Sequence, residues 1–351
     1  MQFNKKQGLF LTKTIQDWQA QGIISPETAD TLSSSFKIRP FDWARLAKYS
    51  FWISIICAVI AVAAILLDEM LMELLQRLFH SSGLVPCIIF SILSVVTYIL
   101  AFKRRKKFPK KTFSNEAIIF IGVLFTAAAV AFFGKFIDTG SGHYSLLFLL
   151  STVIYAVIAF CFPSRLVWIF CLLSLGAWFG TETGYMSGSG AYFLGMNYPL
   201  RFILFGSVLV ALSFAFKPRA FLNEFSHSTY VIGLLYLFIA LWILSIFGNY
   251  SDLDTWREIP QYQLALWGIL FAAVALVTIF YGLKYDDATS RGFGITFLFI
   301  NLYTRYFEYF WDHTHKAIFF IILAVSFWLI GRYAEKIWNL EFSSLENIKQ
   351  K

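Results

Sequence analysis

Apolar residues along this chain come in long stretches that short polar segments separate. A helix that crosses the hydrocarbon core of a bilayer needs about twenty mostly apolar residues. Backbone polar groups in lipid must be satisfied within the segment, so such stretches are interpreted as helices. Ten stretches fit, and the fifth is the shortest. The predicted spans are Leu46–Leu67, Leu84–Phe102, Ala117–Phe133, Tyr144–Phe162, Leu166–Gly180, Leu200–Phe216, Thr229–Phe247, Tyr262–Tyr281, Phe293–Phe310 and Ala317–Tyr333.

The segment before these stretches follows the pattern of water-soluble helices. In residues 5–36, Leu11, Ile15 and Trp18 fall on one helical face. Ser25, followed by a proline and a glutamate, is a typical start for a second helix. The segment predicts a two-helix hairpin. About thirty residues are too few for an independent core, so the hairpin either packs on the rest of the chain or recruits a protein partner.

Composition points to the same class of protein. The chain of 351 residues is 58% apolar and only 14% charged, whereas soluble domains are about 45–50% apolar and about a quarter charged. The fold class predicted is all-α: a polytopic transmembrane bundle of about ten spans with a small soluble hairpin. The predicted parts are the cytoplasmic hairpin 1–44, the bundle 45–335 and a cytoplasmic tail 336–351. The lipid bilayer is the expected surrounding.

Positive charge gathers between the second and third predicted spans. Short cytoplasmic loops carry an excess of Lys and Arg, so this loop is expected on the cytoplasmic side, together with both termini. All but six of the 29 basic residues then fall on that side. The run is interpreted as a topology determinant beside anionic headgroups, and the net charge of +8 then needs no nucleic-acid partner. The basic residues of this run are Lys103, Arg104, Arg105, Lys106, Lys107, Lys110 and Lys111.

One predicted span carries a stripe of polar residues. Asn301, Arg305, Glu308 and Asp312 follow at spacings of 4, 3 and 4, which places them on one helical face. Arg305 and Glu308 are spaced for an ion pair within the helix. Ionisable residues inside a span commonly face a protein interior or a cavity; alternatively, this pair anchors the helix end at the interface. Arg201, at the start of the sixth span, is a candidate to join Glu308 or Asp312.

Motifs of catalysis and of cofactor binding are lacking. The sequence contains no G-x-S-x-G, P-loop, dinucleotide fingerprint or H-E-x-x-H. His313 and His315 stand two residues apart, which is not the spacing of helical zinc ligands. We therefore expect no catalytic, cofactor-binding or metal site, and a membrane enzyme is the least favoured interpretation.

Both ends of the chain resemble a bacterial family known as predicted membrane protein, domain of unknown function 2157. The N-terminal resemblance is carried by Trp18 and by the stretch from Gly22 to Leu32. The C-terminal resemblance is carried by Thr304-Arg305-Tyr306-Phe307. The resemblance to this family implies a multi-pass protein of the bacterial cytoplasmic (inner) membrane with a short cytoplasmic helical domain. It implies no biochemical activity.

Two main functions fit these features. The first is handling or transport of a small solute or a lipid through a polar cavity beside the ninth span. The second is a membrane-anchored scaffold that acts through the hairpin and the basic loop. A cavity that reaches the polar stripe favours the first function, and a closed, fully satisfied bundle favours the second.

Overall fold

A computed structural model describes residues 2–35, 37–39, 53, 57, 83–109, 112–137, 143–188, 190–250, 253–311 and 314–338. Apart from Ile53 and Cys57, the predicted first span Leu46–Leu67 lies outside the described residues. So do Lys110, Lys111 and Asp312, and so does most of the predicted tail. The chain forms two compact units, Met1–Gly122 and Val123–Lys351, and each is described by itself.

The first unit begins with two short strands and two helices. Strand β1 (Gln2–Asn4) pairs in parallel with β2 (Lys37–Arg39); strands this short show no alternation that a sequence pattern could reveal. Between them lie α1 (Lys5–Ala20) and α2 (Pro26–Ser34), which contact each other. The predicted helix start at Ser25 is confirmed, because its hydroxyl accepts a hydrogen bond from the Thr28 amide at 3.3 Å.

The same unit contains α5 (Leu84–Lys107) and the first half of α6 (Thr112–Phe136). The two helices approach closely at Gly122. The Ser94 hydroxyl donates to the Gly122 carbonyl at 3.5 Å, and a β-carbon on Gly122 would lie 2.9 Å from the Tyr98 ring. A larger residue at position 122 would have to displace the Tyr98 ring.

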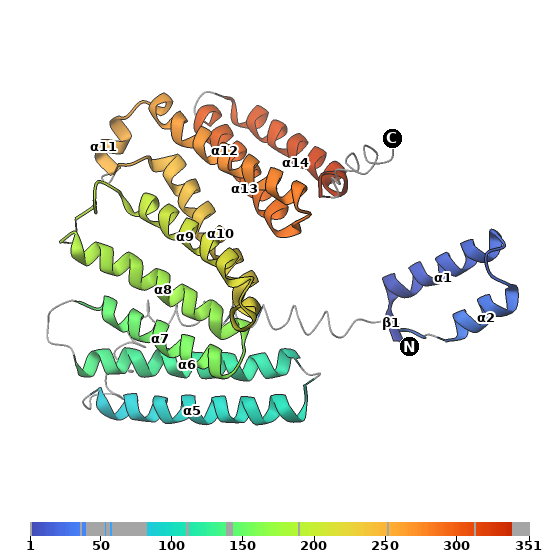
Figure 1. The fold of residues 1–351 in the computed structure, drawn as a ribbon. Helices are drawn as coiled ribbons and strands as arrows, with labels where there is room; N and C mark the ends of the chain where they lie inside the picture. Colours follow the sequence, from blue (N-terminus) through green and yellow to red (C-terminus); the bar gives the residue numbers. More distant parts are fainter. Residues whose placement is uncertain are drawn as a thin grey trace. The chain divides into compact units, whose positions relative to one another are not determined.

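The second unit is built from the rest of α6 and from helices α7 to α14 (Figure 1). Helix α10 is its centre, because α8, α9, α12 and α13 all pack against it. The bounds are α7 (Ser145–Cys161), α8 (Arg165–Met186), α9 (Tyr198–Phe216), α10 (Ala220–Phe247), α11 (Leu253–Glu258), α12 (Gln261–Lys284), α13 (Ala288–Phe310) and α14 (Lys316–Trp338).

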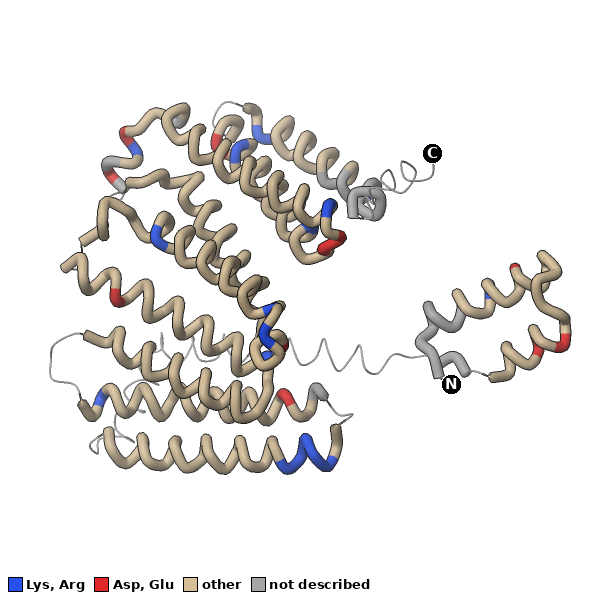
Figure 2. Tube along the Cα trace, viewed as in Figure 1, with Lys and Arg blue, Asp and Glu red and all other residues tan. Residues whose placement is uncertain are grey.

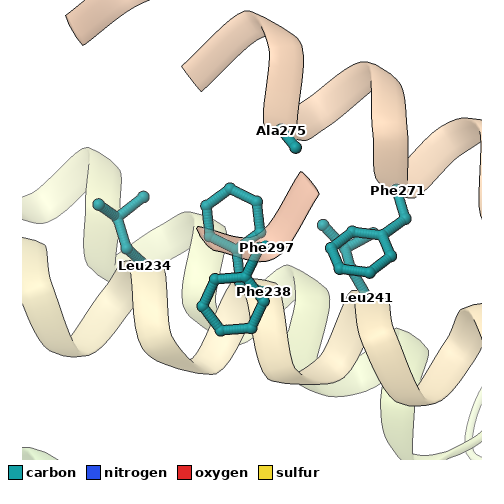
Figure 3. Packing of buried hydrophobic residues seen from close by; sticks show 6 residues of the cluster. All are labelled: Leu234, Phe238, Leu241, Phe271, Ala275 and Phe297. Carbon is teal, nitrogen blue, oxygen red and sulfur yellow. The ribbon is translucent and has the colours of Figure 1, made fainter. Parts of the chain in front are cut away.

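Aromatic rings fill the space between α10, α12 and α13. Phe238 and Phe271 are fully buried, and Phe297 stacks on Phe238 with ring centroids 4.9 Å apart (Figure 3). Stacked or edge-on aromatic pairs stabilise a core beyond the burial of their area. This cluster holds α13, and with it the predicted polar stripe, against the central helix.

Two glycines bring α9 and α10 into close contact. A β-carbon on Gly206 would lie 2.5 Å from the Leu237 amide nitrogen, and one on Gly233 would lie 2.8 Å from that of Val210. Real β-carbons do not approach backbone atoms so closely, so any larger residue would force the helices apart. Small residues at a crossing allow tight packing between membrane helices.

Among the described residues, six helices are long and apolar enough to cross a membrane: Leu84–Lys107, Ser114–Phe136, Arg165–Met186, Tyr198–Phe216, Ala220–Phe247 and Tyr262–Lys284. Apolar helices of this length are typical of an integral membrane protein. Helix α7 is apolar but shorter, at 17 residues. Helix α13, which carries the stripe, is not among these six. Whether about ten segments span a bilayer stays a prediction.

The predicted fifth span, Leu166–Gly180, was too short. Helix α8 continues to Met186 and has 22 residues. The added turns contain polar residues whose hydroxyls are satisfied within the helix: Thr181 donates to the Ala177 carbonyl and Thr183 to the Phe179 carbonyl, each at 2.8 Å. The apolar stretch therefore does not mark where this helix ends.

Candidate groove beside helix α13

The polar stripe of α13 faces neighbouring helices. Asn301 is 5% exposed, and its side-chain amide donates to the Gly268 carbonyl of α12 at 2.9 Å. The ideal β-carbon position of Gly268 lies 3.4 Å from the Arg305 side chain. Asn301 and Arg305 therefore share one interhelical surface, as their spacing predicts.

Arg305 joins the end of α10 to the stripe. Its Nη2 donates to the Ser245 carbonyl at 2.8 Å and to Glu308 Oε1 at 2.9 Å, while Nη1 lies 2.5 Å from Glu308 Oε2. The predicted ion pair is thus present, with two N···O contacts, of which the one from Nη2 is a hydrogen bond. Helix α10 ends at Phe247, so Ser245 is among its last four carbonyls, which lack a partner inside the helix. A guanidinium at this position satisfies one of them and complements the helix dipole.

Glu308 lines an open groove of about 700 Å³ between α10 and α13. The walls are largely apolar and aromatic, with Trp242 and Ile246 from α10 and Ile300, Tyr303 and Phe307 from α13 among them. The indole N–H of Trp242 donates to the Thr304 hydroxyl at 3.0 Å across the groove wall. Ligand pockets usually have this form: concave, mainly apolar, with a few polar groups.

The polar groups around the stripe are only partly satisfied. Asn301 Oδ1 and Arg305 Nε are buried and have no hydrogen-bond partner among the described residues. Unsatisfied buried polar atoms cost free energy and are uncommon in native structures. Neither Asn301 nor Arg305 lines the groove, which Glu308 alone of the described stripe residues reaches.

Arg201 does not join Glu308. It is 1% exposed, and its guanidinium donates to the Met196 carbonyl at 2.9 Å and to the Ala191 carbonyl at 3.0 Å. It also lies 4.6 Å from the centre of the Tyr198 ring. Both carbonyls belong to the segment that leads into α9, so Arg201 shapes that segment locally. Asp312, its other predicted partner, lies outside the described residues.

The same segment is tied to the α10–α11 turn. The Asn197 side chain caps α9 by accepting from the Leu200 amide at 3.3 Å and donates to the Gly248 carbonyl at 2.8 Å. The Asn249 side-chain oxygen accepts from the Asn197 amide at 3.0 Å. These bonds explain why the glycine-rich sequence before α9 adopts one arrangement: polar side chains on both sides satisfy its backbone.

The described part of the basic run ends helix α5 (Figure 2). Lys103, Arg105, Lys106 and Lys107 are exposed, and Arg104 donates to the Ser114 hydroxyl at 3.0 Å. Cations near a helix C-terminus interact favourably with its dipole. The run thus lies where headgroups would meet α5 if α5 spans a bilayer.

Three groove features were not foreseen from the sequence: Trp242, Thr304 and the carbonyl of Ser245. Each belongs to an apolar stretch and has no charge to distinguish it. The nearest signal is the spacing of Ile300, Thr304 and Phe307, which puts them beside Glu308 on one face of α13.

Long apolar helices, with a carboxylate at one end of the groove between two of the bundle's helices, define a helical bundle of the integral membrane class. No family model, curated protein or solved structure matches this chain.

Proposed function

We propose that this chain is a multi-pass membrane protein that binds an amphiphile, such as a lipid, in the groove between α10 and α13 and handles or transports it. One observation carries the proposal: a mainly apolar groove of about 700 Å³ ends at a partly buried carboxylate, Glu308. The apolar walls suit an acyl chain, and the Glu308 carboxylate, which Arg305 holds from behind, suits a polar head. This shape favours a lipid over a small polar solute.

The remaining assignments form part of the same proposal. They are about ten spans, cytoplasmic termini, a bacterial inner membrane and membership of the family of unknown function 2157. Six apolar helices of sufficient length support the membrane location, and the Lys- and Arg-rich end of α5 supports the orientation. Reporter fusions at Lys107 and Tyr250 test the orientation, and a periplasmic signal at Lys107 contradicts it.

Filling the groove tests the binding proposal. The purified chain is mixed with a lipid that carries bromine on its acyl chains, and tryptophan fluorescence is recorded. Bromine quenches nearby indoles, so the difference between the native chain and the Trp242→Phe variant reports on the groove. We expect saturable quenching of the Trp242 contribution. Ile300→Phe, which narrows the groove without adding an indole, should weaken it.

Ile321→Phe is the matched control, because it makes the same change on α14 at a side chain that is 62% exposed. Quenching of Trp242 should persist in this variant. If quenching rises linearly with lipid, without saturation, or if Ile300→Phe and Ile321→Phe behave alike, the groove is not a binding site.

A second function, recruitment of a protein partner, is favoured by the surface of the N-terminal helices. Ile15 and Ala29 are buried, yet Phe10 is 70% and Ile23 is 63% exposed. Apolar residues left exposed on a small hairpin suit docking to another protein. Phe10→Ser combined with Ile23→Ser should abolish capture of a partner and leave lipid binding in the groove intact; an unchanged set of captured proteins contradicts this function.

A further inference from the structure

A second pocket lies at the opposite end of the same helices. It measures about 510 Å³ and is formed where α9 leads into α10 and where α12 leads into α13. The groove described above involves the end of α10 and residues from Thr296 to Glu308 of α13, whereas this pocket involves the first turns of α10 and the two residues before α13. The two sites share no residue.

Aromatic rings form one wall of the pocket. Phe214 of α9 meets Tyr230 of α10 with ring centroids 5.5 Å apart and meets Tyr281 of α12 at 6.1 Å. Tyr281 also lies 4.7 Å from Tyr285. Aromatic faces attract cations, and rings from several helices are a common way to hold an ammonium group.

A mostly exposed carboxylate lies beside this wall. Asp287 is committed to the helix, because it caps α13 through the amides of Thr289 and Ser290, each at 3.2 Å. Asp286 makes an ion pair with Arg291 at 3.7 Å, and its side chain remains 91% exposed. Its backbone has a φ of 49°, which aspartate and asparagine tolerate better than most residues.

Positive charge lines the same pocket. The Lys217 ammonium lies 4.7 Å from the centre of the Phe214 ring, and His227 is exposed nearby. A lysine beside an imidazole provides several donors for an anion that has several oxygens. Groups of both signs therefore face one cavity of a size usual for small ligands.

From this arrangement we propose that the pocket binds a zwitterion that joins a primary ammonium to a phosphate, the chemistry of phosphoethanolamine. The ammonium is held by Asp286 and the tyrosine rings, and the phosphate is held by Lys217 and His227. The pocket lies at helix ends, where lipid phosphates would be found if these helices cross a bilayer. The source of the zwitterion is either a lipid headgroup or a free solute.

Calorimetry of the purified full-length chain with O-phosphoethanolamine tests this inference. Ethanolamine and inorganic phosphate, titrated separately, measure the two halves of the ligand. Asp286→Asn keeps the backbone conformation and removes the charge, and Lys217→Gln removes the opposite charge. We expect each variant to bind about tenfold more weakly, because each loses a charge-assisted contact.

Asp254→Asn is the matched control. Asp254 is also largely exposed, at 86%, and also lies near one arginine, Arg257, at 3.6 Å, but it belongs to α11. The Asp254→Asn variant should bind O-phosphoethanolamine as tightly as the native chain does. The inference is overturned if no binding heat is observed, if either half binds as tightly as the whole, or if Asp286→Asn and Lys217→Gln match the control.

Lipid nanodiscs identify the source. If discs of phosphatidylethanolamine compete with soluble phosphoethanolamine while discs of phosphatidylcholine do not, the ligand is a headgroup. If neither kind competes, the ligand is a solute. Both results retain the ammonium–phosphate chemistry, and loss of amphiphile binding in the groove would leave this pocket unaffected.

Discussion

Replacing Arg305 with methionine keeps most of its apolar stem and removes the guanidinium. The change removes the bond to the Ser245 carbonyl and the ion pair with Glu308, which contains one hydrogen bond. A hydrogen bond to a charged group contributes about 1.5–3 kcal/mol. The Arg305 and Glu308 side chains remain 17% and 21% exposed, so screening by solvent reduces the contribution of their ion pair. We expect the free energy of unfolding to fall by about 3 kcal/mol.

A double-mutant cycle separates the pair from the helix cap. Glu308→Gln leaves the Ser245 bond intact and should cost about 1 kcal/mol. The double variant should cost about 1 kcal/mol less than the sum of the single variants, since either single change already breaks the pair. The assay is equilibrium unfolding in mixed detergent micelles, followed by tryptophan fluorescence. Arg257→Met, at a largely exposed pair, is the control and should have little effect.

The reasoning fails if the coupling between Arg305 and Glu308 is smaller than about 0.5 kcal/mol, the usual scatter of additive changes. It also fails if Arg305→Met leaves stability unchanged, because the guanidinium would then not hold the end of α10. Arg305→Leu further separates the two interpretations of the stripe. If the stripe is a structural anchor, this variant is less abundant in the membrane. If the stripe serves a functional cavity, the variant remains abundant and loses ligand binding.

Three further predictions concern the packing and capping of the helices. Phe238→Ala, at a fully buried ring, should lower the free energy of unfolding by about 3–5 kcal/mol, measured in the same unfolding assay; a cost below about 1 kcal/mol would contradict the packing described. Gly206→Leu should abolish folded protein on size-exclusion chromatography, because its β-carbon would lie 2.5 Å from the Leu237 amide. Asn197→Ala should cost about 1–2 kcal/mol through the lost cap and should speed limited proteolysis before α9, since the bond to Gly248 is also lost; an unchanged cleavage rate would count against that bond.

Local rules accounted for much of the chain. The Ser25 start of α2 follows from cap chemistry, and the Arg305–Glu308 pair follows from a spacing of three on a helix. Apolar stretches located α5, α6, α9, α10 and α12 because backbone satisfaction in lipid leaves helices as the available structure. Helix ends were less accurate, as Met186 in α8 shows, because a helix can continue past its apolar residues when its polar side chains are satisfied within it.

Contacts between distant segments could not be predicted in this way. Arg201 was expected to cross the bundle, but carbonyls of its own preceding segment hold it, and a sequence pattern does not reveal where an irregular segment folds. Trp242 and Thr304 meet only because α10 and α13 pack side by side. The pocket at Asp286 depends on two separate turns that lie next to each other, and no spacing within either turn encodes it.

Crosslinking with a photoactivatable lipid tests the central claim, the lipid-binding groove, most directly. The native chain in membranes is irradiated with a lipid that carries a diazirine on its acyl chain, and the labelled residues are mapped by mass spectrometry. The account predicts labelling concentrated on groove residues such as Ile300 and Phe307, which excess unlabelled lipid suppresses. Labelling spread evenly over exposed apolar positions, such as Ile321 and Val277, with no suppression by competitor, would contradict it.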